Sequence, residues 1–164
     1  MIVRLSPDEG MAAAVVGATQ MIRATARGWV GNDHGGKSGR AVRERWAQAI
    51  HGAMAELAAA CALGRPWRSG VDGITGGDIG TIQVRATPWD DGHLIINEAD
   101  VKKWPDAPFL LVTGHWPELR MVGWMLGADA AQPAWFRANE RPPSYWVPQA
   151  SLRPFEELAV TYRT

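Results

Sequence analysis

The pattern of apolar and polar positions predicts two long helices, followed by a group of strands. At the N-terminus, the segment SPDEG is typical of a helix start, with Ser6 as the cap and Glu9 placed to complete a capping box. We therefore expect a first helix over 7–27. A second helix is expected over about 39–63, because a glycine and then a proline follow it as stop signals.

Apolar residues of the second helix recur every three or four positions and predict a buried stripe, formed by Trp46, Ile50, Met54, Leu57 and Cys61. In this alanine-rich setting, we expect Cys61 to act as a small buried hydrophobe. Glu56 lies next to the stripe among alanines, whose small side chains would let its carboxylate reach inward. The alternative is an exposed glutamate at the margin of the helix.

Shorter apolar runs bounded by glycine, proline and aspartate predict strands after the second helix, at 71–74, 82–87, 93–97, 109–114 and 119–125. The run FLLVTG is nearly continuous, as expected of a central strand covered on both faces. A short helix is expected over 98–104. The order of elements predicts an α/β or α+β fold with a mixed central sheet flanked by helices. We expect a single domain over 1–164, with a core at about 39–128 and an irregular tail of short helix and loop over 129–164.

The segment GGDIGTIQVRAT, residues 76–87, combines a glycine turn, an acid and an alternating strand. Residues two apart on a strand point the same way, so Gln83 and Arg85 are expected side by side on the face opposite Val84. Asp78 opens the strand. An acid, an amide and a guanidinium gathered in this way indicate a metal or phosphate site. The alternative is an exposed strand face with a surface ion pair.

Composition excludes several classes of protein. Lysine plus arginine equals aspartate plus glutamate, at 17 each, so net charge gives no reason to expect nonspecific attraction to nucleic acid or membrane. A single cysteine allows no intrachain disulfide and favours a reducing compartment. Because no leader pattern and no apolar run of spanning length are found, we expect a cytoplasmic protein without a membrane partner. Phosphate-loop, nucleophile-elbow, zinc-cluster and dinucleotide motifs are also missing from the sequence.

Aromatic and basic residues beside glycine-rich segments are candidates for contact with nucleic acid. Tryptophans placed to stack on an unpaired base are Trp29, Trp67, Trp89 and Trp116, with core or rim packing as the alternative. The glycine-rich stretch 28–40 carries His34, Lys37 and Arg40, which could touch a phosphate backbone. A solvated surface loop is the alternative there.

Hydrolysis of a phosphodiester with a divalent ion needs hard oxygen ligands and a cation that orients water or stabilises the developing charge. Asp78, Glu56 and Gln83 can supply three such oxygens to Mg²⁺ or Mn²⁺, and Arg85 can supply the cation. Asp72 is a competing choice for the metal aspartate, and a turn residue before Gly73 is the alternative for it.

These motifs, in this order, resemble the PD-(D/E)XK nuclease superfamily, and more narrowly its small phage and prophage proteins. The resemblance rests on the helix glutamate in HGAMAELAAA, on DIGTIQVRAT, on a following L-I-I strand with a downstream aspartate, on an LLV strand and on a G-W segment. It implies a restriction-endonuclease-like core and a Mg²⁺- or Mn²⁺-dependent DNA nuclease of phage or prophage origin, working in the host cytoplasm. It also implies Glu56, Asp78 and Gln83 as metal ligands, with these three and Arg85 as catalytic residues.

Two positions depart from the pattern of that superfamily. Gln83 stands where an acid is usual, and Arg85 stands where lysine is usual; an arginine does not lose its proton near neutral pH and cannot act as a general base. It can still clamp a phosphate by a bidentate contact. These departures motivate the alternative of a catalytically inactive nuclease-fold protein that binds nucleic acid or a phage or host protein. The sequence leaves open whether the chain forms a homodimer.

Overall fold

The computed structural model describes residues 1–27, 40–67, 77–140 and 142–162. In these ranges the helices are α1 (Pro7–Ala26), α2 (Arg40–Leu63), α3 (Glu98–Lys103), α4 (Gly127–Ala130) and α5 (Phe155–Thr161). The strands are β1 (Ile2–Arg4), β2 (Gln83–Thr87), β3 (Leu94–Asn97), β4 (Pro108–His115), β5 (Glu118–Leu126), β6 (Phe136–Arg137), β7 (Ser144–Val147) and β8 (Arg153–Pro154). Single 3-10 turns occur at Pro133–Trp135 and Gln149–Ser151. The strand expected at 71–74 and the stretch 28–39 lie outside the described residues.

The central sheet is mixed, as the sequence predicts, and has the strand order β1-β5-β4-β2, with β8 paired to β5. Strand β2 runs parallel to β4, whereas β1, β4 and β8 each pair with β5 in the antiparallel sense. Six consecutive residues of β4 are buried, which confirms a central strand covered on both faces. Strand β2 lies at one end of this order, and no second strand of the described residues pairs with its outer edge.

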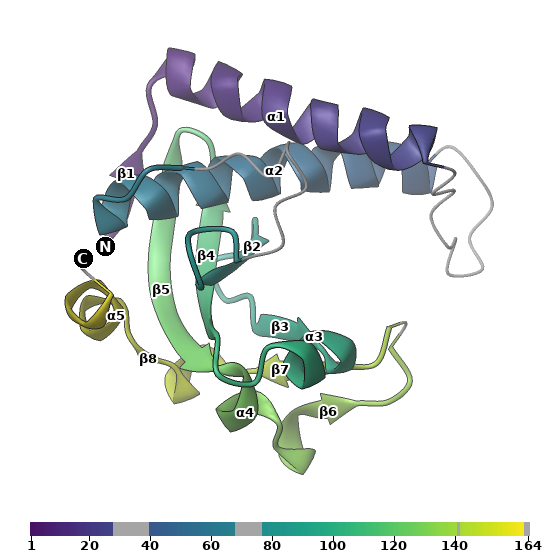
Figure 1. Ribbon diagram of the computed structural model, residues 1–164, viewed down its shortest axis with the longest axis vertical. Helices are drawn as coiled ribbons and strands as arrows, with labels where there is room; N and C mark the ends of the chain where they lie inside the picture. The colour runs from purple at the N-terminus through teal and green to yellow at the C-terminus, as the bar shows by residue number, and fades with distance from the viewer. Residues whose placement is uncertain (28–39, 68–76, 141, 163–164) are drawn as a thin grey trace.

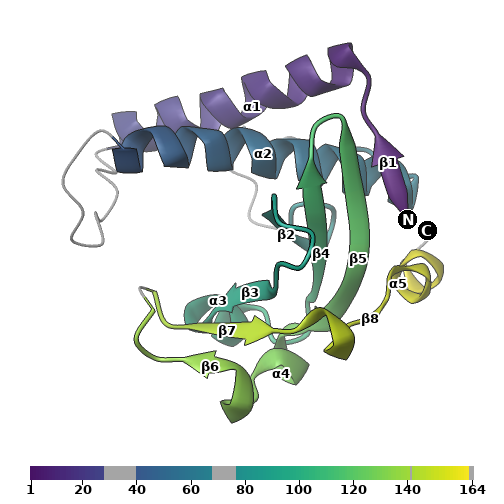
Figure 2. The same cartoon turned by 180° about the vertical axis from the view of Figure 1, so that it is seen from behind.

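Both long helices lie on one face of the central sheet, in two layers (Figure 1; Figure 2). Helix α1 begins as expected, with the Ser6–Glu9 capping box formed. It packs outside α2, and α2 covers the sheet. The contact between the helices is close, because a Cβ atom added at Gly17 would lie 2.6 Å from the carbonyl oxygen of Ala49.

The buried face of α2 differs from the predicted stripe. The residues that are fully covered are mostly alanines: Ala53, Ala55, Ala58, Ala59, Ala60 and Leu63. Cys61 is exposed, and Met54 and Leu57 are only partly buried, so the predicted burial of Cys61 is wrong. Small side chains let the helix backbone approach the sheet closely. The sequence prediction chose the larger residues because they are more hydrophobic than alanine.

The tail from Gly127 contains short helices, as expected, but it also forms strands that were not predicted. Strand β7 pairs with β3 and with β6, which makes a second, three-stranded sheet on the far side of the central one. A second apolar core lies between the sheets and includes Leu94, Ile96, Phe109, Leu111, Met125 and Val147. The described residues after Ala128 therefore include strands β6, β7 and β8 and helix α5, so this part of the chain is more regular than expected.

Helix α5 also belongs to the core. Phe155 and Leu158 are 2% and 0% exposed and pack in the cluster that α2 forms with the sheet. No helix of the described part of the chain has the length and apolar character needed to cross a membrane.

Candidate functional site

Asp78 is held in a tight turn immediately before β2. Backbone hydrogen bonds join Gly77 to Gly80 and Ile79 to Ile82, at 2.9–3.1 Å, and Gly80 has a positive φ of 66° that favours glycine. Ile79 and Ile82 are 1% and 0% exposed, so both are anchored in the core. The turn that the sequence predicts for this short spacing is therefore present, and it fixes Asp78 beside the free edge of β2.

The backbone of Val84 is paired at this edge by side chains rather than by another strand. Oδ2 of Asp78 accepts a hydrogen bond from the Val84 N–H at 2.6 Å. The Arg85 guanidinium donates to the Val84 carbonyl oxygen at 2.9 Å, and its Nη1 lies 3.8 Å from Oδ2 of Asp78. Asp78 and Arg85, both predicted as site residues, thus meet at Val84 on the edge of the sheet.

Arg85 is held from several sides. Its Nη2 forms an ion pair of 2.9 Å with Asp100, in α3, and its guanidinium carbon lies 5.1 Å from the centre of the Phe109 ring. Asp100 follows the L-I-I strand, and the sequence analysis assigned it no role. The resemblance did include an aspartate after this strand, which could have pointed to Asp100. Nothing in the neighbouring sequence showed that α3 would direct its side chain toward Arg85.

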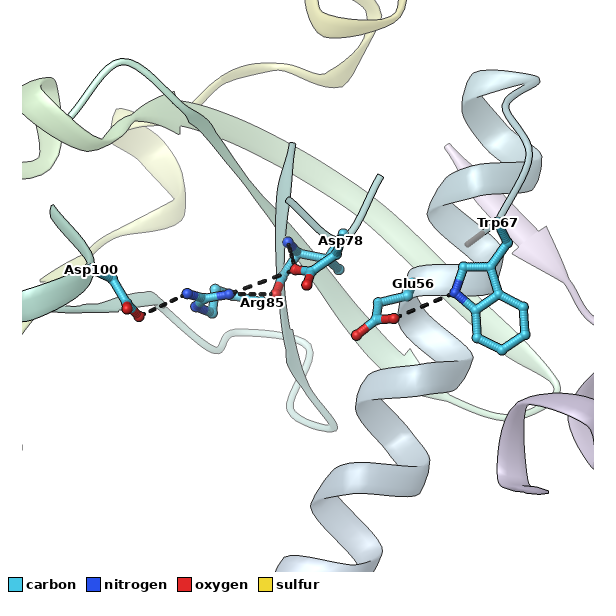
Figure 3. Close-up of polar contacts among 6 residues, drawn as sticks. Glu56, Trp67, Asp78, Arg85 and Asp100 are labelled. Carbon is cyan, nitrogen blue, oxygen red and sulfur yellow. Dashed lines mark hydrogen bonds and ion pairs between the residues drawn. The ribbon is translucent and has the colours of Figure 1, made fainter. Parts of the chain in front are cut away.

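Glu56 reaches inward from α2, in agreement with the first of the two sequence interpretations. Figure 3 shows its carboxylate pointing toward Asp78 and Arg85, with the Trp67 ring on its other side. The Trp67 Nε1 lies 3.4 Å from Oε2 of Glu56, at the long end of the hydrogen-bond range. These side chains lie in a row, in the order Asp100, Arg85, Asp78, Glu56 and Trp67. Polar contacts join Asp100 to Arg85, Arg85 to Asp78 and Trp67 to Glu56, whereas Asp78 acts on Glu56 through its charge.

The two carboxylates raise the energetic cost of negative charge in this row. Burial, and to a smaller extent the nearby Asp78 charge, raise the pKa of Glu56 to about 7, against the lowering effects of Trp67 and Arg85. Burial also raises the pKa of Asp78, against the opposing effects of the Val84 N–H and Arg85. Arg85 thus offsets only part of the negative charge.

Gln83 lies apart from this row. Its side chain is only 4% exposed, so the alternative of an exposed strand face is wrong for this residue. It lines a cavity of about 360 Å³ together with Lys103, Trp104 and Asp106. No contact joins it to Glu56 or Asp78 among the described residues. The structure therefore brings together three of the four predicted site residues, Glu56, Asp78 and Arg85.

The surroundings include a larger hollow of about 790 Å³, lined by Arg85, His51, Trp89 and Trp146 among others. Two of the tryptophans singled out for stacking are exposed, Trp89 at 71% and Trp116 at 43%. Trp29, His34 and Lys37 lie outside the described residues, as does Asp72, so its competition with Asp78 stays open.

The donor set fits a divalent cation held by two protein carboxylates. Among the residues that the structure describes, no three histidine, cysteine, aspartate or glutamate side chains gather to hold a metal ion. Mg²⁺ commonly needs fewer protein ligands, because it binds through one or two carboxylates and completes its shell with water and substrate phosphate. Glu56 and Asp78 are the two carboxylates that would hold such an ion, and the hydrogen bond and the ion pair of Asp78 both engage its Oδ2.

Comparison of the chain with protein-family models, curated proteins and solved structures gave no match. The resemblance to the PD-(D/E)XK superfamily therefore stays a prediction, and the site is argued from its own geometry.

Proposed function

We propose that this protein is a divalent-metal-dependent nuclease that hydrolyses phosphodiester bonds in DNA. The observation that carries the proposal is the convergence of Glu56 and Asp78, from two distant parts of the chain, beside the Arg85 guanidinium. Two desolvated carboxylates with raised pKa values form a place where a divalent cation relieves repulsion. The adjoining guanidinium suits a phosphate.

Each residue has a distinct role in this proposal. Glu56 and Asp78 would hold Mg²⁺ or Mn²⁺, and when bound such an ion supplies Lewis-acid activation of the phosphodiester. Arg85 would bind a phosphate oxygen, and because it keeps its proton it positions the substrate rather than acting as a base. Asp100 would fix the orientation of Arg85 through their 2.9 Å ion pair. In keeping with the sequence analysis, we place this reaction in the host cytoplasm and assign the chain to a phage or prophage.

Nicking of supercoiled plasmid tests the proposal. We expect nicks with Mg²⁺ or Mn²⁺ and none with EDTA, and Glu56→Gln and Asp78→Asn should each slow the rate by at least about tenfold, a loss of 1.4 kcal/mol or more. Both variants keep an oxygen that can accept from Trp67 or Val84. Asp129→Asn is a matched control, because Asp129 pairs with Arg153 in an exposed ion pair. Nicking that needs no metal, or that survives in both site variants, would refute the proposal.

A second candidate is a nuclease-fold protein that binds nucleic acid or a protein partner without cutting. Its support is that Gln83 faces a separate cavity and that Arg85 is already paired with Asp78 and Asp100. Calorimetry with Mn²⁺ and gel-shift measurements separate the two. Retarded DNA without nicks, and without heat of Mn²⁺ binding, favours the second candidate.

A further inference from the structure

The cavity beside Gln83 is built from three parts of the chain. The turn before β2 supplies Gly77, Gly80 and Thr81, the strand supplies Gln83, and the segment that follows α3 supplies Trp104, Pro105 and Asp106. Its volume of about 360 Å³ is within the range of small-molecule sites, which start near 300 Å³. A group of one or two rings fits such a space.

Gln83 carries the polar group that this cavity leaves unused. Its side chain is 4% exposed, and its amide Nε2 is buried without a hydrogen-bond partner. In the parallel pairing of β2 with β4, Gln83 lies opposite Phe109, so its side chain shares a sheet face with the second apolar core. A buried donor without an acceptor is costly and uncommon in folded proteins. A turn of the amide toward the cavity that Gln83 lines would let an oxygen or ring nitrogen of a ligand satisfy it.

The charged groups of the cavity favour an uncharged ligand. Lys103 and Asp106 both line it, so their formal charges cancel. The Lys103 Nζ also lies 4.1 Å from the centre of the Trp104 ring, a cation–π contact that already engages the ammonium. Much of the remaining wall is formed by the Trp104 ring, Pro105 and two glycines. A flat neutral group whose edge offers both acceptors and donors matches the Gln83 amide, the Thr81 hydroxyl and the Asp106 carboxylate.

We propose that this cavity binds one nucleobase, with a base acceptor atom taking the hydrogen bond from Gln83 Nε2. The inference rests on the proposed function, because the cavity adjoins the carboxylate site: Gly77 precedes Asp78, and Gln83 precedes Val84. The base must leave its stack to enter, so the substrate strand is unpaired or opened at this nucleotide.

Binding is measured in EDTA, where no cleavage occurs. The probes are the four deoxynucleoside monophosphates, a short single-stranded oligonucleotide of mixed sequence, and inorganic phosphate alone. ¹⁵N-edited NMR follows the side-chain NH₂ signal of Gln83 during each titration. We expect a nucleotide to shift this signal and phosphate to leave it unchanged. Tighter binding of the oligonucleotide identifies a DNA strand as the source of the base, and tighter binding of a monophosphate identifies a free nucleotide.

Gln83→Leu keeps the size of the side chain but removes the amide. We expect its dissociation constant for the nucleotide or oligonucleotide to rise at least tenfold, with the melting temperature not lowered. Gln132→Leu is the matched control, because Gln132 is exposed and bonds only a nearby backbone oxygen.

Equal binding by Gln83→Leu and the native chain overturns the inference, as does an equal response to phosphate or no response to any nucleotide. These outcomes are independent of the plasmid assay. If the protein nicks DNA but binds nucleotides equally well without Gln83, the proposed nuclease function stands and the nucleobase site is refuted. If it binds nucleotides through Gln83 but never nicks DNA, the nucleobase site stands and the nuclease function is refuted.

Discussion

At the scale of single residues, Glu56 is a carboxyl group whose charge changes near neutral pH instead of at its usual acidic pH. Its carboxylate leaves solvent when α2 packs on the sheet, and the Asp78 charge is close by, so its pKa rises to about 7. A carboxyl group that gains a proton on folding stabilises the fold at low pH and weakens it at high pH. The same property prepares it for a divalent cation, which competes with the proton for the carboxylate.

The stability of the native chain should therefore fall as pH rises. The proton on Glu56 stabilises the folded state fully below about pH 4.5, and this contribution is lost as pH rises to about 7. Glu56→Gln resembles the protonated form at every pH. We expect urea unfolding to show equal stability of the two proteins at pH 4 and an advantage of about 2–3 kcal/mol for Glu56→Gln at pH 8.

Addition of a divalent metal ion provides a control for the stability comparison between the native chain and Glu56→Gln. Mn²⁺ added at pH 8 should stabilise the native chain and leave Glu56→Gln unchanged, because binding to the folded state alone shifts the unfolding equilibrium. Parallel stability curves for the two proteins between pH 4 and pH 8 would contradict the raised pKa.

Gln83 is a buried polar residue whose side-chain amide nitrogen has no hydrogen-bond partner. Because its Nε2 lacks a partner in the free protein, Gln83→Leu should be neutral or stabilising by about 1 kcal/mol, in contrast to most buried substitutions. Thermal unfolding of the ligand-free protein measures this. A loss of more than about 1 kcal/mol would mean that the amide contributes to the fold itself.

At the scale of elements, the packing of α1 on α2 depends on small residues. A Cβ at Gly17 would lie 2.6 Å from the Ala49 oxygen and from the Ile50 Cα, so the helices must separate to admit it. We expect Gly17→Ala to cost about 1–3 kcal/mol by overpacking. Gly52→Ala is the matched control, because nothing lies within 4 Å of a Cβ at Gly52.

Gly52→Ala should gain about 0.5–1 kcal/mol, since alanine is the better helix former. Circular dichroism during urea unfolding measures both changes. Equal effects of the two substitutions would show that the helices do not pack as described.

The local signals in the sequence were sufficient for the helices and for the strands with strong patterns. The Ser6–Glu9 capping box and the glycine after Leu63 mark ends that depend only on neighbouring residues, and both agree with the structure. Strand β7 was missed because only four residues between prolines form it, and its stability comes from pairing with β3, about fifty residues earlier. Non-local pairing of this kind leaves no local pattern.

The candidate site shows the same division. The sequence offered an inward Glu56 as one of two alternatives, because its alanine neighbours are small, and it favoured Asp78 presented by a tight turn. It did not indicate that Gln83 faces a second core, because the second sheet that builds this core was not expected. Alternation of residue types separates the two faces of a strand, but which face is buried depends on the elements that pack against it.

At the scale of the whole molecule, two apolar cores share the central sheet. The cluster beneath α2 is completed by α5, which returns from the far end of the chain to cover Trp124. The two ends of the fold therefore contribute to the same cluster. Val3 of β1 packs against it, Leu5 joins it directly after the strand, and α5 adds Phe155 and Leu158. Loss of either is expected to weaken the surface on which α2 presents Glu56.

Leu158→Ala tests this arrangement. Because Leu158 is 0% exposed, we expect a loss of about 2–5 kcal/mol, measured by urea unfolding. Val160→Ala is the control on the same helix, since Val160 is 76% exposed and should change stability by less than about 0.5 kcal/mol. A small effect at both positions would show that α5 is not part of the cooperative core.

The side chains that occupy the Val84 backbone have a consequence beyond chemistry. Asp78 takes the N–H and Arg85 takes the carbonyl oxygen, which are the two groups that an incoming strand from another molecule would need. We therefore expect this pair to oppose edge-to-edge association of β2 with a strand of another molecule. Both residues would have this role in a chain that does not cut DNA, so their presence alone does not identify an enzyme.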